Sequence, residues 1–274
     1  MCGSQLLPRP RNMRIGIPSK QALESCLNHR GFDLLAVGLI VATVTAAAVM
    51  IAGKAASLNE PVFLVCERNG GGSFNEPLNL MSCAVFFIAA WLLWRDYQQT
   101  REGHDEERVI LVLLITLVGV TSAGFHIAAL RFALYEELAA VTLFIAVAGY
   151  ITFRRELGLA AKPAVACLAL LAVLAALADC VPGAYRFNGS AAWLPVVAVM
   201  AFLAWTLSRR GHFMATGFLA ATGILAAGVI FRFLDPALCR PLPMGTYFVW
   251  RLCEGMAFYQ VAWALRQRRS AAVT

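Results

Sequence analysis

The sequence predicts an all-α protein, a polytopic bundle of transmembrane helices. Of its 274 residues, 60% are hydrophobic and only 14% are charged, and the mean hydropathy is +0.69. Soluble domains carry about 25% charged residues, so this composition is typical of a membrane protein. The apolar residues gather in segments at 33–53, 77–94, 109–130, 132–153, 163–181, 191–208, 213–234 and 246–265. Most of them reach the roughly 20 residues that a helix needs to cross a bilayer, so we expect eight membrane-spanning helices.

Positive charge is unevenly distributed over the loops that join these segments. If the N-terminus is cytoplasmic, most of the 23 lysines and arginines fall in tails and loops on the inner side. The outer loops hold only Lys54, Arg68, Arg131, Arg186 and Arg240. Cytoplasmic loops of membrane proteins are enriched in such residues, so both termini are predicted to be cytoplasmic. We therefore attribute the net charge of +7 to the topology and expect it to attract anionic lipid. No nucleic-acid partner is expected.

The apolar segments divide the chain into five regions. Residues 1–32 are predicted as a polar cytoplasmic tail, 33–53 as an extra N-terminal span and 54–76 as an extracytoplasmic loop. Residues 77–266 form the membrane domain, and 267–274 a basic cytoplasmic tail. Segment 33–53 follows basic residues and ends in small ones, as a signal peptide does. We favour a retained anchor because its roughly 21 residues exceed the apolar core of a signal peptide, about 7–15 residues, and the cleaved alternative stays open.

Five of the eight cysteines form two groups that bear on the fold. Cys66 and Cys239 lie in the outer loops that precede the second and the eighth segment. In an oxidising compartment a disulfide between them would join the two loops, and the alternative is two free thiols. Cys83, Cys167 and Cys253 lie inside apolar segments, and we interpret them as small packing residues.

Polar side chains interrupt three apolar segments near their predicted outer ends. Ser122 and His126 are four residues apart and so share one helix face. The next segment and the last one begin with further polar residues, namely Glu136, Glu137, Tyr247, Arg251 and Glu254. Ionisable groups at membrane depth are costly, and they mark functional sites. We therefore expect one outward-facing pocket to gather these residues.

Five short motifs occur in order along the chain. They are EPLNLMS at 76–82, SAGFH at 122–126, an acid at 137, FRFLDPALC at 231–239 and GTYFVW at 245–250. In this order they resemble the alkaline ceramidase family, especially its bacterial members, over roughly residues 64–266. That family belongs to a wider set of membrane hydrolases that includes the adiponectin receptors. The resemblance implies a seven-span core that hydrolyses the amide bond of ceramide-like lipids at a zinc site, with segment 33–53 as an additional span.

The resemblance also implies roles for individual residues. Ser122 matches a serine of the family, His126 a zinc-binding histidine, and Glu137 an aspartate that acts with the zinc-bound water. A calcium site of eukaryotic members would fall on Glu67, Asn69 and Glu76. An aspartate that this calcium site also uses is absent, since leucine and valine occupy positions 64 and 65. The calcium site is therefore incomplete.

The last apolar segment departs from the family pattern at the zinc site. The resemblance implies zinc-binding histidines at the positions of Tyr247 and Arg251. A hydrolytic zinc site needs three protein ligands and an open position for water. The remaining histidines, His29, His104 and His212, fall in predicted cytoplasmic segments and cannot reach His126 across a bilayer. The sequence therefore predicts a degenerate zinc site that retains one ligand.

Arg251 puts a permanent cation where the resemblance implies a metal. A buried guanidinium without a partner is costly, so it should pair with an acid. We predict an ion pair between Arg251 and Glu137, with Glu136 and Glu254 as further candidate partners.

The residues support more than one function. The first hypothesis is a ceramidase-family membrane protein with weak or no hydrolase activity and a retained lipid cavity. The alternatives are a non-enzymatic protein that binds a lipid or a partner protein, and a transporter. In each case we expect an integral membrane protein of the bacterial inner membrane, with the site on the extracytoplasmic side.

Overall fold

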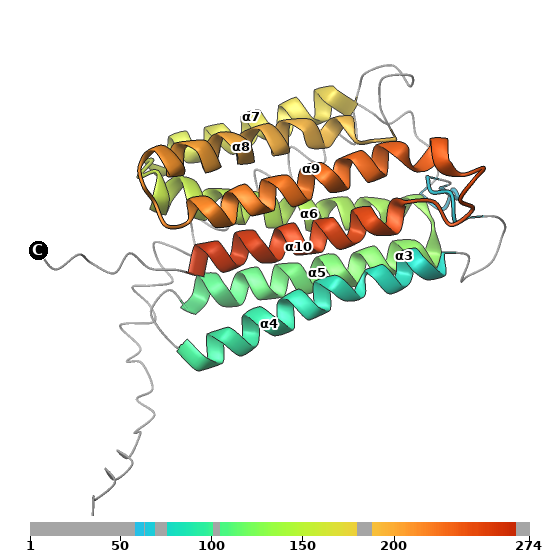
Figure 1. The fold of residues 1–274 in the computed structure, drawn as a ribbon, viewed down its shortest axis with the longest axis horizontal. Coiled ribbons are helices and arrows are strands. Elements are labelled where there is room, and N and C mark those ends of the chain that lie inside the picture. Colours follow the sequence, from blue (N-terminus) through green and yellow to red (C-terminus); the bar gives the residue numbers. More distant parts are fainter. Residues whose placement is uncertain (1–57, 63, 69–75, 101–104, 180–187, 267–274) are drawn as a thin grey trace, which may run out of the picture. The chain divides into compact units, whose positions relative to one another are not determined.

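The structure is a computed structural model that describes residues 58–62, 64–68, 76–100, 105–179 and 188–266. Most of these residues are helical (Figure 1), while 58–62 and 64–68 are loop, with an isolated β-bridge between Pro61 and Leu130. The α-helices are α3 (Pro77–Ser82), α4 (Ala84–Thr100), α5 (Asp105–Ala128), α6 (Arg131–Ile151), α7 (Ala161–Asp179), α8 (Leu194–Arg209), α9 (Ala215–Leu238) and α10 (Tyr247–Arg266). A π-helix, η2 (Thr152–Glu156), continues α6, and a 3₁₀-helix, η4 (Ala191–Trp193), precedes α8. The predicted tail 1–32, the span 33–53, most of the loop 54–76 and the tail 267–274 lie outside the described residues.

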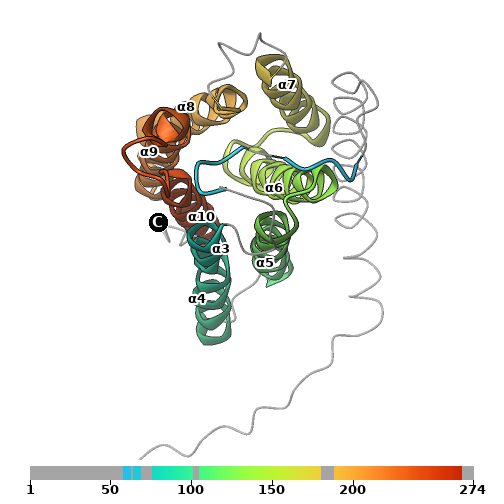
Figure 2. The same cartoon turned by 90° about the vertical axis from the view of Figure 1, so that its right-hand side faces the viewer.

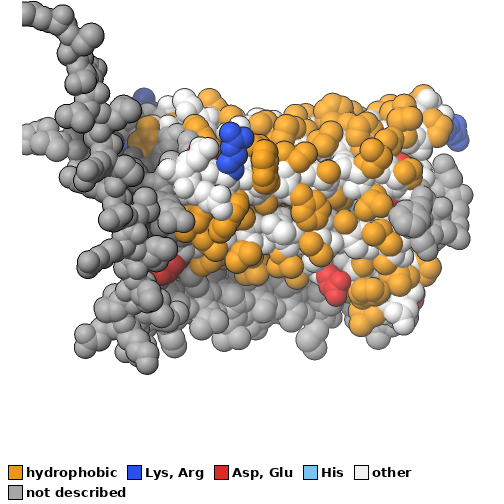
Figure 3. All heavy atoms as spheres, turned by 90° about the horizontal axis from the view of Figure 1, so that it is seen from below, with side chains coloured by type: hydrophobic (Ala, Val, Ile, Leu, Met, Phe, Trp, Pro, Cys, Tyr) orange, Lys and Arg blue, Asp and Glu red, His pale blue; other side chains and the backbone are white. Residues whose placement is uncertain are grey.

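Six helical segments are long and apolar enough to cross a membrane. They are Pro77–Gln99, Glu106–Ala128, Arg131–Glu156, Ala161–Ala178, Ala191–Arg209 and Ala215–Leu238. Each coincides with one of the eight predicted spans, from the second to the seventh. Hydrophobic side chains cover most of the described surface on the face drawn in Figure 3, with few charged groups among them. The six apolar helices indicate an integral membrane protein.

Helix α10 corresponds to the eighth predicted span but is not one of these six segments. Its 20 residues are enough to cross a bilayer, yet they include Arg251, Glu254 and Gln260. Arg251 and Glu254 are buried, because α10 contacts α9, α4, α3, α5 and α6. Figure 2 shows the helices end-on, with α10 between α9 and α3. The charged groups that lower the hydropathy of α10 therefore face other helices of the protein.

The turn between α5 and α6 aligns the two helices that carry the polar motif. Only two residues separate the helices, and Ala129 in this turn has a φ of 46°. The carbonyl of Ala129 accepts a hydrogen bond from the N–H of Val62 at 2.8 Å, so the segment 58–62 is bound to the turn. Because the connection is so short, the last turns of α5 lie beside the first turns of α6. Ser122 and Glu137 are thereby brought to the same level.

Asp235 fixes the start of α10. Its Oδ1 accepts the N–H groups of Thr246 at 2.6 Å and Tyr247 at 2.9 Å, and its Oδ2 accepts the N–H of Cys66 at 3.1 Å. A carboxylate in this position satisfies N–H groups that a helix leaves unpaired at its first turn. Cys66 also forms a disulfide with Cys239, with Cα atoms 5.2 Å apart, which is one of the two alternatives that the sequence left open. The outer loop, the end of α9 and the start of α10 are therefore held together.

Candidate functional site

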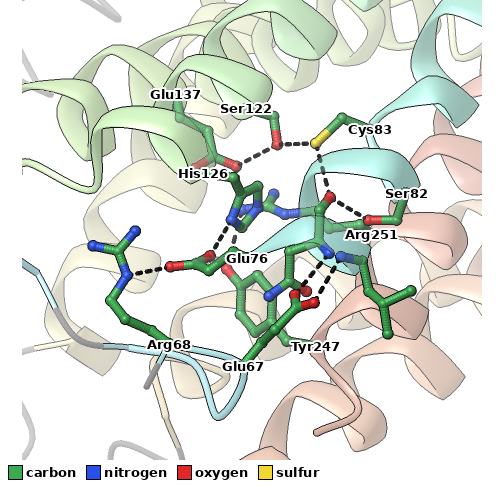
Figure 4. Close-up of polar contacts among 12 residues, drawn as sticks. Glu67, Arg68, Glu76, Ser82, Cys83, Ser122, His126, Glu137, Tyr247 and Arg251 are labelled. Carbon is green, nitrogen blue, oxygen red and sulfur yellow. Dashed lines mark hydrogen bonds and ion pairs between the residues drawn. The ribbon is translucent and has the colours of Figure 1, made fainter. Parts of the chain in front are cut away.

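A cluster of buried polar side chains lies where α3, α5, α6 and α10 meet (Figure 4). It contains all three residues to which the resemblance assigns chemistry, Ser122, His126 and Glu137, and both residues at the altered ligand positions, Tyr247 and Arg251. Each of these side chains belongs to a residue that is no more than 4% exposed. The helices thus bring together residues that lie more than 120 positions apart in the sequence.

Arg251 pairs with two carboxylates of this cluster. Its Nη1 lies 2.8 Å from Oε2 of Glu254, and its Nη2 forms an ion pair with Oε1 of Glu137. Nη2 also donates to the Tyr247 hydroxyl at 3.0 Å, and the guanidinium carbon lies 5.0 Å from the centroid of that ring. The structure therefore contains the Arg251–Glu137 pair, and Glu254 is a second partner. Glu136, the other candidate, is exposed on α6 and forms no ion pair among the described residues.

Ser122 and Cys83 extend the cluster towards α4. The Ser122 hydroxyl donates to Oε1 of Glu137 at 3.2 Å, and the Cys83 thiol donates to the Ser122 oxygen at 3.4 Å. Cys83 is 1% exposed, and the carbonyl of Asn79, 3.3 Å from its sulfur, is an alternative acceptor for the same proton. Our interpretation as a packing residue is wrong for Cys167, which is exposed, but it agrees with the burial of Cys83. The contacts of Cys83 with Ser122 and Asn79 add a polar role that the sequence did not indicate. A thiol in an apolar segment carries no sequence signal for such a contact, because the contact depends on how α4 faces α5.

His126 is held by a carboxylate that comes from the start of α3. Its Nδ1 lies 2.5 Å from Oε2 of Glu76, while Oε1 of Glu76 accepts a hydrogen bond from Nε of Arg68 at 2.5 Å. The ring of His126 packs edge-on against Tyr247, with centroids 5.9 Å apart. The Nε2 atom of His126 is buried and has no hydrogen-bond partner among the described residues. Sequence reasoning named Glu76 only for calcium and missed its contact with His126.

The two described acids of the expected calcium site are engaged within the protein. Oε1 and Oε2 of Glu67 accept the N–H groups of Leu78 at 2.7 Å and Asn79 at 2.9 Å, at the first turn of α3. Glu76 is paired with Arg68 and His126. Asn69 lies outside the described residues. Because Glu67 binds backbone donors and Glu76 faces a guanidinium, these residues do not fit a calcium site, which requires several free oxygen ligands.

The zinc site implied by the resemblance does not fit either. In the described parts of the chain, no three His, Cys, Asp or Glu side chains are grouped so as to hold a metal ion. The guanidinium of Arg251 lies against both nearby carboxylates, where it would repel a second cation. His212 lies in the connection between α8 and α9 and contacts Glu156 of η2, with Nε2 and Oε2 3.2 Å apart, so it is not part of the cluster around His126. His29 and His104 lie outside the described residues.

Several polar atoms of the cluster are buried without a hydrogen-bond partner among the described residues. They are His126 Nε2, Glu137 Oε2, Glu254 Oε1, Arg251 Nε, Trp250 Nε1, and both Oδ1 and Nδ2 of Asn79. A buried polar group left unsatisfied costs about 1–3 kcal/mol, so such groups usually bind water or a ligand. Asn79 is completely buried, and sequence reasoning did not single it out although it lies inside the EPLNLMS motif. The cluster therefore offers both donors and acceptors to a polar group.

An apolar cavity lies next to this cluster. It is bordered by α6, η2, α7, α8, α9 and α10, and its volume is about 60 Å³. Its wall is formed almost entirely by hydrophobic side chains, among them Phe144, Leu171, Leu203, Leu225 and Phe258. Ala257 and Phe258 in this wall follow Glu254 by three and four residues, so they share its face of α10. The cavity thus begins about one helical turn from the polar cluster.

The polar cluster, where α3, α5, α6 and α10 meet, and the apolar cavity, bordered by α6, η2, α7, α8, α9 and α10, share helices α6 and α10. Comparisons of the chain with protein-family models, with curated proteins and with solved structures find no match.

Proposed function

We propose that the chain is a ceramidase-like integral membrane protein that binds a single lipid and does not carry out zinc-dependent hydrolysis. In this proposal a seven-span core is preceded by an additional N-terminal span, eight in all. The observation that carries the proposal is the apolar cavity one helical turn from a cluster of buried, partly unsatisfied polar groups. Binding sites for lipids combine such an apolar volume with a few polar groups that orient the ligand.

The energetics favour a lipid over a small polar molecule. Because the wall around Phe144 and Phe258 is as apolar as the bilayer, an acyl chain can enter the cavity from the membrane without leaving an apolar environment, whereas a polar molecule cannot. The unsatisfied oxygens of Glu137 and Glu254 would accept hydrogen bonds from the polar end of the same molecule. A ceramide-like lipid carries both parts. No nucleic-acid partner belongs to this proposal.

The loss of zinc-dependent hydrolysis is proposed from Arg251. Zinc would activate water if it were bound by three protein ligands, but the guanidinium of Arg251 is paired with Glu137 and Glu254 where the resemblance implies the metal. The remaining residues have other roles: Ser122 donates to Glu137, and Glu76 orients His126.

The orientation in the membrane is part of the proposal. The distribution of basic residues supports cytoplasmic termini and an extracytoplasmic site in a bacterial inner membrane. The disulfide between Cys66 and Cys239 supports the same orientation, because Asp235 accepts the N–H groups of both Cys66 and Tyr247 and so holds the bond beside the polar cluster. Disulfides persist in oxidising compartments such as the periplasm.

A residual amide hydrolase is the second candidate. The hydrogen bond between Ser122 and Glu137 favours it, because the resemblance assigns a catalytic serine and a catalytic acid to these two positions. In that case Ser122→Ala would abolish hydrolysis of a ceramide-like amide in the purified protein, whereas a lipid-binding protein would show no hydrolysis above background.

Lipid extraction from the purified protein tests the main proposal. Protein isolated in a mild detergent is expected to retain about one lipid per chain, identified by mass spectrometry. Ala148→Phe narrows the cavity from α6 and should reduce the retained lipid severalfold. Val173→Phe is the matched control, since Val173 is 45% exposed on α7 and lies outside the cavity wall. Equal lipid content in both variants and the wild type would contradict the proposal.

A further inference from the structure

We infer that Arg232, near the end of α9, binds the phosphate group of a phospholipid from the surrounding bilayer. This lipid is a second ligand, apart from the one proposed for the apolar cavity, because Arg232 is not among the residues that line the cavity. The inference goes beyond the proposed function and stands whether or not the cavity holds a lipid.

The first argument is that the guanidinium of Arg232 is held in place. Its Nε donates to the carbonyl of Asn188 at 3.1 Å, and the side-chain amide of Asn188 donates to the carbonyl of Arg232, also at 3.1 Å. The guanidinium carbon lies 5.4 Å from the ring centroids of both Tyr247 and Trp250, so the cation is stacked on two aromatic side chains. Because the guanidinium is already ordered, little side-chain entropy is lost when it binds an anion.

The second argument is that this charge has no acidic partner. Among the described residues Arg232 forms no ion pair, and its Nη1 and Nη2 atoms have no hydrogen-bond partner. Segment 180–187, which precedes Asn188, contains no acidic residue. Asp235, one turn further along α9, accepts three backbone N–H groups instead. The guanidinium therefore presents a pair of N–H donors whose geometry matches two oxygens of a phosphate group.

The third argument is the position of Arg232 at the edge of the apolar surface. It lies near the end of the apolar helix Ala215–Leu238, and its partner Asn188 lies in the connection before η4. Arg232 is partly exposed, and its neighbours Phe231 and Phe233 are 37% and 45% exposed. Arginines near the ends of membrane-spanning helices reach the headgroup region of the bilayer. A cation for the phosphate thus adjoins apolar surface for acyl chains, which favours a phospholipid over a free anion.

The test is thermal unfolding in a mild nonionic detergent, with and without dioctanoyl phosphatidylglycerol. A ligand that binds only the folded protein raises its Tm, so we expect a rise of several degrees for the wild type. In Arg232→Gln the rise should fall to the level that dioctanoylglycerol, which lacks the phosphate, produces in the wild type. The matched control is Arg240→Gln, which removes an exposed positive charge beyond the end of α9 and should keep the full rise.

Three results would overturn the inference. The first is a rise in Arg232→Gln as large as in the wild type, and the second is an equal response of the wild type to phosphatidylglycerol and dioctanoylglycerol. The third is an equal rise with inorganic phosphate at the same concentration, which would identify a free anion as the ligand. If Arg232→Gln does not fold, Arg232→Lys replaces it. Lysine keeps the charge but lacks the planar fork, so Arg232→Lys should need severalfold more phosphatidylglycerol for the same rise, and an unchanged requirement would also contradict the inference.

The variant Ala148→Phe separates this inference from the proposed function. It narrows the cavity, so it should lose co-purified lipid and keep the phosphate-dependent rise in Tm. If Ala148→Phe abolished that rise, the phosphate would belong to the cavity lipid and the inference of a second ligand would be wrong. Unchanged lipid content in Ala148→Phe would count against the proposed function alone.

Discussion

Oε2 of Glu76 lies 2.5 Å from Nδ1 of His126, and this contact joins the start of α3 to the end of α5 across 50 positions of sequence. The other carboxylate oxygen of Glu76 binds Arg68, in the segment that the Cys66–Cys239 disulfide attaches to α9. One carboxylate thereby connects the outer loop with the polar cluster between the helices.

Removal of the Glu76 carboxylate should destabilise the protein strongly. Glu76→Ala leaves the buried guanidinium of Arg68 without this partner, and breaking a buried pair in this way costs about 3–5 kcal/mol. Denaturant unfolding in detergent measures the change. Glu60→Ala is the matched control, because the Glu60–Arg131 pair is 47% and 32% exposed at its side chains and such surface pairs contribute about 0–1 kcal/mol. Equal losses in the two variants would contradict the role of Glu76.

Truncation of Arg251 should have a comparable effect. Arg251→Ala leaves the carboxylates of Glu137 and Glu254 buried without their cation, at a cost of about 3–5 kcal/mol. The double variant Arg251→Ala/Glu137→Ala should lose less than the sum of the two single variants, because they share one interaction. Glu136→Ala, at the exposed neighbour of Glu137, should change stability by no more than roughly 0.5 kcal/mol. Thermal unfolding in detergent compares these four variants with the wild type, and an Arg251→Ala variant as stable as the wild type would exclude a stabilising pair.

Reduction of the Cys66–Cys239 disulfide should lower the Tm. The bond closes a loop of 173 residues, and disulfides that close long loops contribute roughly 2–5 kcal/mol by restricting the unfolded chain. The measurement is a thermal scan with and without reductant. The double variant Cys66→Ser/Cys239→Ser should start at the lower Tm and no longer respond to reductant, while Cys167→Ser, at an exposed free thiol, should behave like the wild type. A reductant response that survives in the double serine variant would show that another group is responsible.

Gly245 should not tolerate a side chain. Its φ is 65°, and an added Cβ would lie 2.7 Å from the Cβ of Cys66 and directly against Oδ1 of Asp235. Gly245→Ala should therefore displace the carboxylate that caps α10, beyond the roughly 1 kcal/mol that positive φ alone costs an alanine. Gly158→Ala is the matched control, since Gly158 has a φ of 71° with nothing within 4 Å of an added Cβ. Unfolding measurements should separate the two variants, and equal losses would mean that the packing around Gly245 is unimportant.

The polar cluster was predictable in part. Ser122, His126 and Glu137 stand out because each interrupts an apolar run, and the cost of an unpaired buried guanidinium led directly to the Arg251–Glu137 pair. The roles of Cys83 and Asn79 were not predictable, because a thiol and an amide next to a helix start have no distinctive pattern. Glu76 was assigned by resemblance to a different task, and only its distance from His126 shows what it contacts.

The amino-acid sequence by itself determined the helices that cross the membrane and the acids and bases they carry, because hydropathy and helical spacing are local properties of the chain. Six of the eight predicted spans coincide with helices long and apolar enough to cross a bilayer. Only the tertiary structure decided that Glu254 is a second partner of Arg251 beside Glu137, and that Glu76 contacts His126. It also placed an apolar cavity about one helical turn along α10 from Glu254. These contacts depend on how each helix is rotated and tilted against its neighbours, which packing sets and sequence spacing does not.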